Sequence, residues 1–286
     1  MSIDSLNAQY GLGDQLVFCE HPSGLVFAKV KTDHCTGEFF LQGAHVTEYQ
    51  DLLFMSSQAV FAQGKSLRGG IPICFPWFNS HPLDANLPAH GWARTSPWQV
   101  LSTRRQDSAI ITELGLNKDH FRLVYRIEMG RILKVFFEAT SLCDISCDYE
   151  VALHTYFHIG DIDRVCISGD LKECGYYDQL TKLDHAATQE PIHFDQETDR
   201  IYYGTASSIA IQDPALERAI EIQSTGSQST VVWNPWIEKS KRMSDFGDLE
   251  YRQMCCVETA NVRRRSVRLE PGQTHRTSLQ IASRPL

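Results

Sequence analysis

The segment Glu150–Asp161, EVALHTYFHIGD, carries two imidazoles and a phenol at alternate positions. Because successive side chains of a β-strand point to opposite faces, one face of this segment is predicted to hold His154, Tyr156 and His158. Buried polar side chains need hydrogen-bond partners, and His is the most frequent general acid or base. The segment alone fits two structural core histidines as well as one wall of a catalytic site.

A carboxylate of the same kind lies near the C-terminus, in the run YRQMCCVETAN. In an extended strand Met254, Cys256 and Glu258 share one face, which places an acid at the strand's end in line with small apolar side chains. A buried Glu is seldom left unpaired. Glu258 is therefore either a strand-end residue facing water or an arginine such as Arg263, or a general base in a partly dry pocket.

Two arginines stand beside glycines in the long section from Gln63 to Trp98, which holds five of the 11 prolines. Proline removes a ladder donor, so this section is predicted to cross the surface of a sheet as an ordered loop. Arg68 precedes a Gly-Gly pair and Arg94 follows a His-Gly pair. Glycine permits close backbone approach and Arg suits phosphate or carboxylate, so the two could hold one anion. Taken singly, each could equally brace a loop.

The elements that must position these residues are predicted to be short strands. Alternating runs bounded by turn residues predict strands at Gln15–Glu20, Leu25–Lys31, Glu38–Leu41, His45–Tyr49, Asp51–Met55, Arg164–Ser168, Ser208–Gln212, Arg218–Gln223 and Thr230–Trp233. A hairpin is predicted from Phe121 to Leu142 around a two-residue Gly130-Arg131 turn, and two closing strands around Pro271-Gly272. Only Trp236–Met243 and Leu249–Gln253 are candidates for short helices.

These patterns predict an all-β, mostly antiparallel sandwich. The sequence shows no linker, fixed-period repeat or charge block, so residues 1–286 are predicted to form a single domain. The nine cysteines include no CxxC pair and are predicted to be reduced, small hydrophobes rather than zinc ligands, disulfides or nucleophiles.

Composition excludes several classes of partner. A formal net charge of -8 and a pI of about 5.8 argue against binding to nucleic acid or an anionic membrane, both of which favour a basic surface. The N-terminus lacks a leader pattern, and no apolar run approaches the length of a membrane span. The protein is predicted to be soluble and cytoplasmic, as a monomer or a weak homodimer.

Four motifs occur in one order along the chain: SLRGGIPICFPWF, AHGWAR, ALHTYF and CVETAN. In this order, and within an all-β chain, they resemble the D-hexose-6-phosphate mutarotases, the glucose-6-phosphate 1-epimerase branch of the aldose 1-epimerase superfamily. The similarity runs from about Leu41 to Gly272. Each motif is weak alone, but the four together are specific.

This resemblance implies a galactose mutarotase-like β-supersandwich whose site lies on the concave sheet. It implies that His154 is the general acid at the ring oxygen and that Glu258 is the base at the C1 hydroxyl. The remaining implied contacts with a small-molecule sugar phosphate are those of the 6-phosphate with Arg68 and Arg94, of the anomeric end with His90, and of a sugar hydroxyl with Asp199. His158 is expected at the rim, and neither a metal nor a cofactor is required.

Three other interpretations remain open from the sequence. The chain could bind or sense sugar phosphates without catalysis. It could hold a metal through His90, His154, His158 and Glu258, although their separation matches no compact ligand motif. It could also be a glycoside hydrolase, which needs two carboxylates about 5–10 Å apart, with Glu258 paired to Asp161, Asp163 or Asp199.

Overall fold

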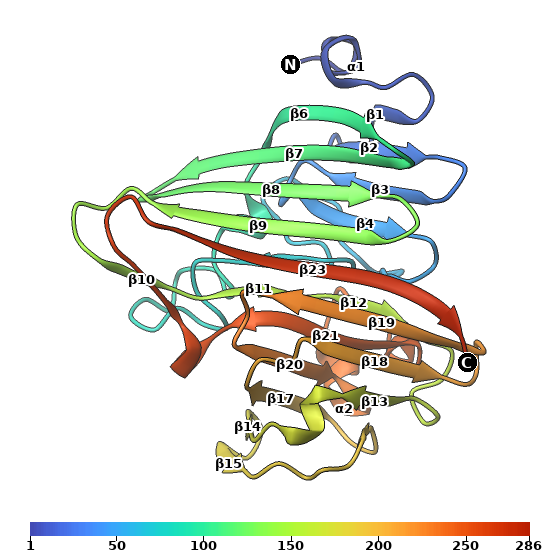
Figure 1. Cartoon of the computed structure of the whole chain (residues 1–286), viewed down its shortest axis with the longest axis vertical. Helices are drawn as coiled ribbons and strands as arrows, with labels where there is room; N and C mark the ends of the chain where they lie inside the picture. The colour runs from blue at the N-terminus through green and yellow to red at the C-terminus, as the bar shows by residue number, and fades with distance from the viewer.

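The computed structural model describes all 286 residues, and antiparallel strands dominate it (Figure 1). The first part of the chain holds α1 (Ile3–Tyr10), β1 (Leu16–Glu20), β2 (Val26–Lys31), β3 (Thr36–Phe40), β4 (His45–Tyr49), β5 (Ile73–Cys74) and η1 (Ala93–Thr95). The middle part holds β6 (Gln99–Gln106), β7 (Ala109–Lys118), β8 (Phe121–Met129), β9 (Leu133–Ser141), β10 (Cys147–Tyr149), β11 (Val151–Leu153), β12 (Tyr156–His158), β13 (Cys166–Gly169), η2 (Asp170–Glu173), β14 (Tyr176–Asp178), β15 (Leu183–His185) and β16 (Ile192–His193). The last part holds β17 (Thr198–Tyr203), β18 (Ser208–Asp213), β19 (Arg218–Thr225), β20 (Ser229–Asn234), α2 (Trp236–Arg242), η3 (Glu250–Gln253), β21 (Met254–Asn261), η4 (Arg263–Arg265), β22 (Val267–Leu269) and β23 (Thr274–Pro285).

Two large sheets form the body of the molecule. The nine-stranded sheet has the order β16-β13-β18-β19-β23-β9-β8-β7-β6, and Figure 1 shows β23, in red, between β9 and β19. The eight-stranded sheet has the order β15-β14-β17-β20-β21-β11-β5, with β12 also paired to β21. A four-stranded sheet of β1–β4 and a two-stranded pair of β10 with β22 complete the fold. The predicted all-β, mostly antiparallel sandwich is confirmed.

The hydrophobic core follows from the alternation of apolar residues along the strands. In β8 every second residue from Phe121 to Met129 is buried, while those between them are partly or fully exposed. One cluster of 61 buried residues includes positions from Leu6 to Ile281. A core shared by both ends of the chain supports the single-domain prediction, which stays a prediction.

Strand β21 differs from β8 in being buried on both faces, because all eight of its residues are buried. Val257 on one face joins the main core, and Ala260 on the other joins a second cluster with Ala152 and Val231. A strand covered on both sides can hold a polar side chain away from bulk water. Glu258, the predicted base, lies on this strand.

Several local predictions need correction. The β8–β9 turn spans three residues, because Met129 pairs with Leu133. Residues 51–55 form isolated bridges rather than a strand, since Leu53 pairs with Phe157 and Met55 with Gly69. Helix α1, capped by Ser2, was not predicted, because its apolar stripe is short. The strands flanking Pro271-Gly272 do not pair with each other: β22 pairs with β10, and β23 with β9 and β19.

No helix of the fold is both long enough and apolar enough to cross a membrane.

The section 63–98 is largely irregular, as predicted, and Gly70 shows how tightly it packs. Gly70 has φ +61°, and a Cβ there would lie 2.2 Å from the Val46 carbonyl oxygen. Gly64 has φ +72° with open space around it. Gly64→Ala is expected to cost only the strain of a positive φ, about 1 kcal/mol, and Gly70→Ala at least about 3 kcal/mol because a clash is added. Denaturant unfolding of both variants checks this, and equal losses would contradict it.

Candidate active site

The segment predicted as one strand is two short strands, β11 and β12, with a break at His154 and Thr155. Both pair with β21 in the same register, since Leu153 lies opposite Thr259 and Tyr156 opposite Cys256. Continuing this register from either side places His154 opposite Glu258. At the break the His154 N–H donates instead to the Pro72 carbonyl oxygen, at 3.0 Å. The proline-rich section therefore anchors the backbone of the histidine.

Two neighbouring rows of side chains cross the eight-stranded sheet at this point. Cross-strand pairing aligns the first row, Ile201, Val231, Glu258 and His154, and the second row, Asp199, Trp233, Cys256 and Tyr156. Glu258 lies within β21 rather than at its end, because the strand continues to Asn261. The polar groups of both rows thus share one face.

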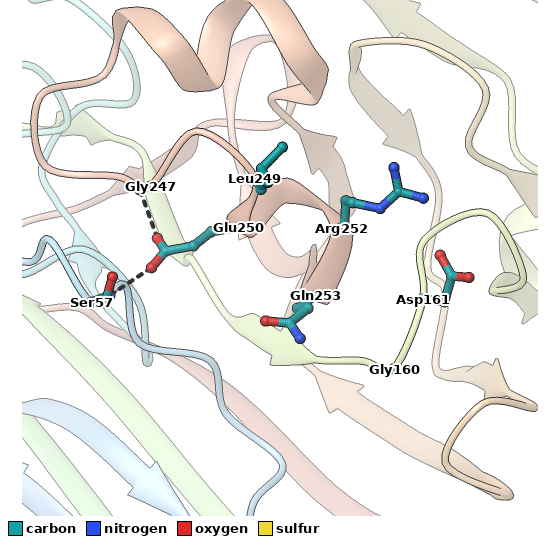
Figure 2. A pocket seen from close by; sticks show the side chains of 8 residues that line it. All are labelled: Ser57, Gly160, Asp161, Gly247, Leu249, Glu250, Arg252 and Gln253. Carbon is teal, nitrogen blue, oxygen red and sulfur yellow. Dashed lines mark hydrogen bonds between the residues drawn. The ribbon is translucent and has the colours of Figure 1, made fainter.

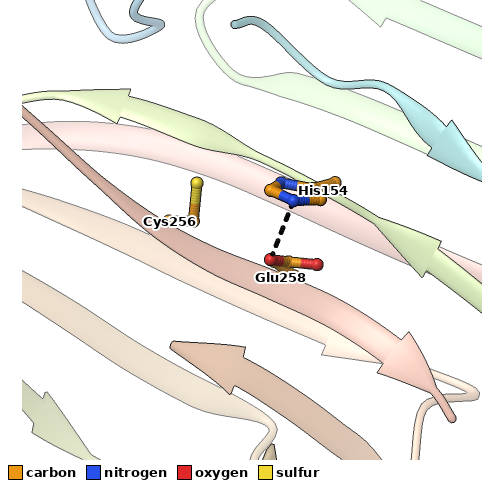
Figure 3. A group of neighbouring side chains, drawn as sticks. All are labelled: His154, Cys256 and Glu258. Atoms are coloured by element: carbon orange, nitrogen blue, oxygen red, sulfur yellow. Dashed lines mark ion pairs between the residues drawn. The ribbon is translucent and has the colours of Figure 1, made fainter. Parts of the chain in front are cut away.

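The His154 and Glu258 side chains contact each other directly (Figure 3). The distance from His154 Nε2 to Glu258 Oε1 is 3.3 Å. Glu258 is 1% exposed and His154 8% exposed. The other heteroatoms, His154 Nδ1 and Glu258 Oε2, are buried without a hydrogen-bond partner in the protein. Glu258 therefore faces neither water nor Arg263, and each side chain keeps one buried polar atom without a hydrogen-bond partner in the protein.

Burial controls the protonation of this pair, because the charged form of each group loses hydration. Burial, with a smaller effect of Asp199, raises the pKa of Glu258 well above its usual range, and Arg94 opposes this. Burial, with smaller effects of His90, Arg94 and Arg68, lowers the pKa of His154 well below its usual range. Both shifts favour the uncharged pair, in which the proton lies on Glu258 and His154 is neutral.

A cavity of about 260 Å³ opens over the pair. Its lining combines aromatic, amide, cationic and acidic groups: Arg68, Phe78, Asn79, His90, His154, Gln179, Asp199, Val231, Trp233, Lys239, Met243 and Glu258. Such a small cavity with convergent polar groups suits a small polar ligand.

Arg68 enters the cavity from the proline-rich section. Its Nε and Nη2 atoms donate to the Asp245 carboxylate at 3.0 to 3.2 Å, and its Nη1 donates to the Tyr156 hydroxyl at 3.1 Å. The Tyr156 ring in turn stacks on His154, with centroids 4.8 Å apart and an interplanar angle of 11°. The arginine is therefore connected to the acid/base pair through one aromatic side chain.

His90 faces the same cavity as a neutral imidazole. The Asn79 N–H donates to its Nδ1 at 3.2 Å, and its ring lies 5.8 Å from that of His154. Burial, with the nearby charges of Arg94 and Arg68, lowers the pKa of His90 to about 3. Because Nδ1 accepts a hydrogen bond, the proton of the neutral ring lies on Nε2, which can donate to a ligand.

Asp199 also lines the cavity. Gln179 Nε2 donates to its carboxylate, and Lys239 Nζ lies 3.8 Å from its Oδ2. Burial raises the pKa of Asp199, while Gln179 and Lys239 oppose that shift. Lys239 also lies 3.0 Å from Glu197 and 5.7 Å from the Trp233 ring centroid. The acid is thus held in place by an amide and a lysine.

Residues 28–282 match the model of the aldose 1-epimerase family. The chain belongs to the aldose 1-epimerase family. A candidate glucose-6-phosphate 1-epimerase of Cenchrus ciliaris is 33% identical over 289 residues, covering 92% of this chain and 86% of that protein. The crystal structure of a candidate mutarotase from Salmonella typhimurium superposes with a TM-score of 0.89 at 26% identity, covering 99% of each chain.

The fold likeness extends to solved structures of much lower sequence identity. The structure of a galactose mutarotase related enzyme from Lactobacillus acidophilus has a TM-score of 0.67 at 11% identity, covering 90% of this chain and 96% of the other. The predicted galactose mutarotase-like supersandwich is therefore confirmed. The resemblance read from the four sequence motifs is confirmed as well, and a binding protein without catalysis is not favoured.

Within this aldose 1-epimerase, five of the six predicted site residues line one cavity: Arg68, His90, His154, Asp199 and Glu258. Arg94 does not line it, and its Nη2 donates to the Ala89 carbonyl oxygen at 2.8 Å. Its charge still reaches the pair, since it influences the pKa of both His154 and Glu258. The specific roles of all six residues stay predictions.

His158 lies outside the cavity, on the far end of β12. Its Nδ1 is 2.9 Å from Asp51 Oδ1, and Arg218 Nη2 donates to its carbonyl oxygen at 2.9 Å. Arg218 also pairs with Asp51 and with the buried Asp213. This network accounts for His158 as a structural residue, and its expected place at the rim of the site stays a prediction.

The cavity also contains residues that sequence reasoning missed, namely Asn79, Gln179, Trp233, Lys239 and Met243. No motif singled them out, and only the pairing of β17, β20 and β21 brings Trp233 between Asp199 and Cys256. Lys239 lies in α2, which was predicted as a helix, but no periodicity shows that this helix covers a cavity.

The structure brings together a group of potential metal ligands that differs from the group considered from the sequence. One potential ligand atom from each of His154, Cys256 and Glu258 lies within 4.8 Å of the others (Figure 3). Burial and the neighbouring Glu258 raise the pKa of the Cys256 thiol well above its usual range. Binding of a metal ion at these three residues would therefore require loss of the thiol proton.

Proposed function

We propose that this member of the aldose 1-epimerase family interconverts the α and β anomers of D-glucose 6-phosphate and related hexose 6-phosphates. The observation that carries the proposal is the buried contact between His154 and Glu258, 3.3 Å apart at the cavity. The names of the relatives support the substrate, and the cationic lining residues Arg68 and Lys239 support a phosphorylated sugar.

The proposed chemistry uses one proton of the pair, which passes from Glu258 to His154 across their 3.3 Å contact before the ring opens. The ring oxygen and the C1 hydroxyl oxygen are bonded to the same carbon, so two adjacent side chains can serve both. His154 as imidazolium donates to the ring oxygen while Glu258 as carboxylate accepts the C1 hydroxyl proton, and the C1–ring oxygen bond breaks. Rotation about C1–C2 presents the other carbonyl face. In the reverse transfer Glu258 returns a proton to the carbonyl oxygen and His154 takes the C5 hydroxyl proton, which restores the starting state.

The other lining residues are assigned by their chemistry. A neutral His90 donates through Nε2 near the anomeric end, and Asp199 accepts from a sugar hydroxyl. Trp233 offers an apolar surface to the pyranose ring. We assign the 6-phosphate to Arg68, with Lys239 as the second cation at the cavity. Arg94 contributes either through its charge or by breaking its hydrogen bond to the Ala89 carbonyl oxygen and binding the phosphate directly.

Direct observation of anomer exchange tests this proposal. Saturation-transfer NMR would be run on glucose 6-phosphate, galactose 6-phosphate, mannose 6-phosphate and glucose, with and without the protein. The expected result is faster exchange of the phosphorylated sugars, unchanged by a chelator. A folded protein that binds these sugars without accelerating exchange would replace the proposal by sugar-phosphate binding alone.

Arg68→Met tests the phosphate contact. Loss of a charge-assisted hydrogen bond of about 1.5–3 kcal/mol should raise KM for glucose 6-phosphate by about 10- to 100-fold. The KM for glucose should change little, because glucose lacks the anion. Arg284→Met is a matched control, since Arg284 pairs with Glu221 on the nine-stranded sheet. An equal rise in KM for both sugars would contradict a phosphate role.

A further inference from the structure

Asp245 binds the Nε and Nη2 edge of the Arg68 guanidinium and leaves the Nη1 and Nη2 edge for a ligand in the cavity. Its Oδ2 accepts from Nε at 3.2 Å, and Nη2 donates to both carboxylate oxygens at 3.2 and 3.0 Å. This is a bidentate arrangement, which fixes the plane of the guanidinium as well as its position. Asp245 is not among the residues that line the cavity.

The remaining donors of Arg68 are those on the Nη1 and Nη2 edge. Nη1 carries two N–H groups and donates one to Tyr156 at 3.1 Å. Nη2 carries a second N–H besides the one given to Asp245. Because Arg68 lines the cavity, this edge can meet an anion while Asp245 stays bound.

The turn that carries Asp245 is itself tied down. The Phe246 ring packs against Phe54, with centroids 5.8 Å apart. The carboxylate of Glu250 accepts from the Gly247 N–H and from the Ser57 N–H, each at 2.8 Å, as Figure 2 shows at the edge of a separate cleft. The turn after α2 and the segment before Arg68 are therefore joined by one side chain.

We propose that Asp245 is a positioning residue for phosphate recognition, which holds the Nη1 and Nη2 edge of Arg68 toward the 6-phosphate, and that Glu250 holds the turn bearing Asp245. The inference rests on the proposed function. An arginine that is already ordered loses less side-chain entropy on binding, so an anion gains more from it.

Asp245→Asn tests the proposal, because it keeps the size of the side chain and removes its charge. KM for glucose 6-phosphate is expected to rise about 10-fold, with kcat changed less than about threefold, since ground-state and transition-state binding of the phosphate weaken together. KM for glucose should stay within about twofold of the wild type. If glucose is not turned over, calorimetric dissociation constants of the two sugars replace KM.

Two further variants make the result specific. Asp163→Asn is the matched control, because Asp163 forms an exposed ion pair with Arg252 at 3.0 Å outside the cavity; both sugars should behave as in the wild type. Glu250→Gln should raise KM for glucose 6-phosphate selectively but by less than Asp245→Asn, and it tests the proposal even if Asp245→Asn does not fold.

Other outcomes would overturn the inference. Parallel losses with both sugars would mean a purely structural role, and a lower KM for glucose 6-phosphate would mean that Asp245 competes with the phosphate. Unchanged kinetics in both variants would show that Arg68 needs no such support. Each of these requires an active wild-type enzyme, whereas failure of the proposed function would appear as a wild type that accelerates no exchange.

Discussion

Glu258→Gln is expected to lower kcat for anomer exchange of glucose 6-phosphate by about 10²–10⁴-fold, the usual contribution of one positioned base. The amide keeps the size of the side chain and can still hydrogen-bond to His154, but it cannot accept the C1 hydroxyl proton. Binding should change little, because the phosphate is proposed to contact Arg68 and Lys239 rather than Glu258. Saturation-transfer NMR measures the exchange rate, and calorimetry measures the dissociation constant.

Glu221→Gln provides a control for this variant. Glu221, on β19, forms an exposed ion pair with Arg284, so loss of this ion pair should leave turnover unchanged. Near-normal turnover of the Glu258→Gln protein would remove Glu258 from the mechanism. A loss of sugar-phosphate binding equal to the loss of turnover would instead make it a binding residue.

His154→Gln is the second change with a large expected effect. It should also lower kcat by about 10²–10⁴-fold, because the ring oxygen loses its proton donor. The double variant with Glu258→Gln should be little worse than either single variant, since acid and base act as one unit. Fully multiplicative losses in the double variant would argue for two independent roles.

The pH dependence of kcat/KM distinguishes the two side chains. The active state holds one proton on the pair. A second proton binds with the lowered pKa of His154, so activity should fall on the acid side well below the usual histidine range. The shared proton leaves with the raised pKa of Glu258, so activity should fall on the basic side well above the usual carboxyl range. His154→Gln should remove the acid limb from the residual activity and Glu258→Gln the basic limb; limbs that stay in place would contradict this assignment.

The sequence by itself determined the fold class and most of the candidate site. The two-residue alternation of β8 and the turn residues between strands are local signals, and they survive folding because each strand buries one face. The motifs around Arg68, His90, His154 and Glu258 each left a structural explanation open when taken singly. Only their combination, through its resemblance to a known family, indicated one site.

Only the tertiary structure decided which of these residues meet. That His154 lies opposite Glu258 depends on the register between β11, β12 and β21, which joins positions 104 residues apart in the chain and leaves no local periodic trace. The placement of Lys239 and Asp245 depends on where the segment after β20 folds. Arg94 was predicted at the phosphate, yet its guanidinium binds the backbone of Ala89, because a loop arginine's direction is set by contacts that the sequence does not encode locally. Strand alternation follows from neighbouring residues, whereas the choice of partner strand and loop path is settled by long-range packing.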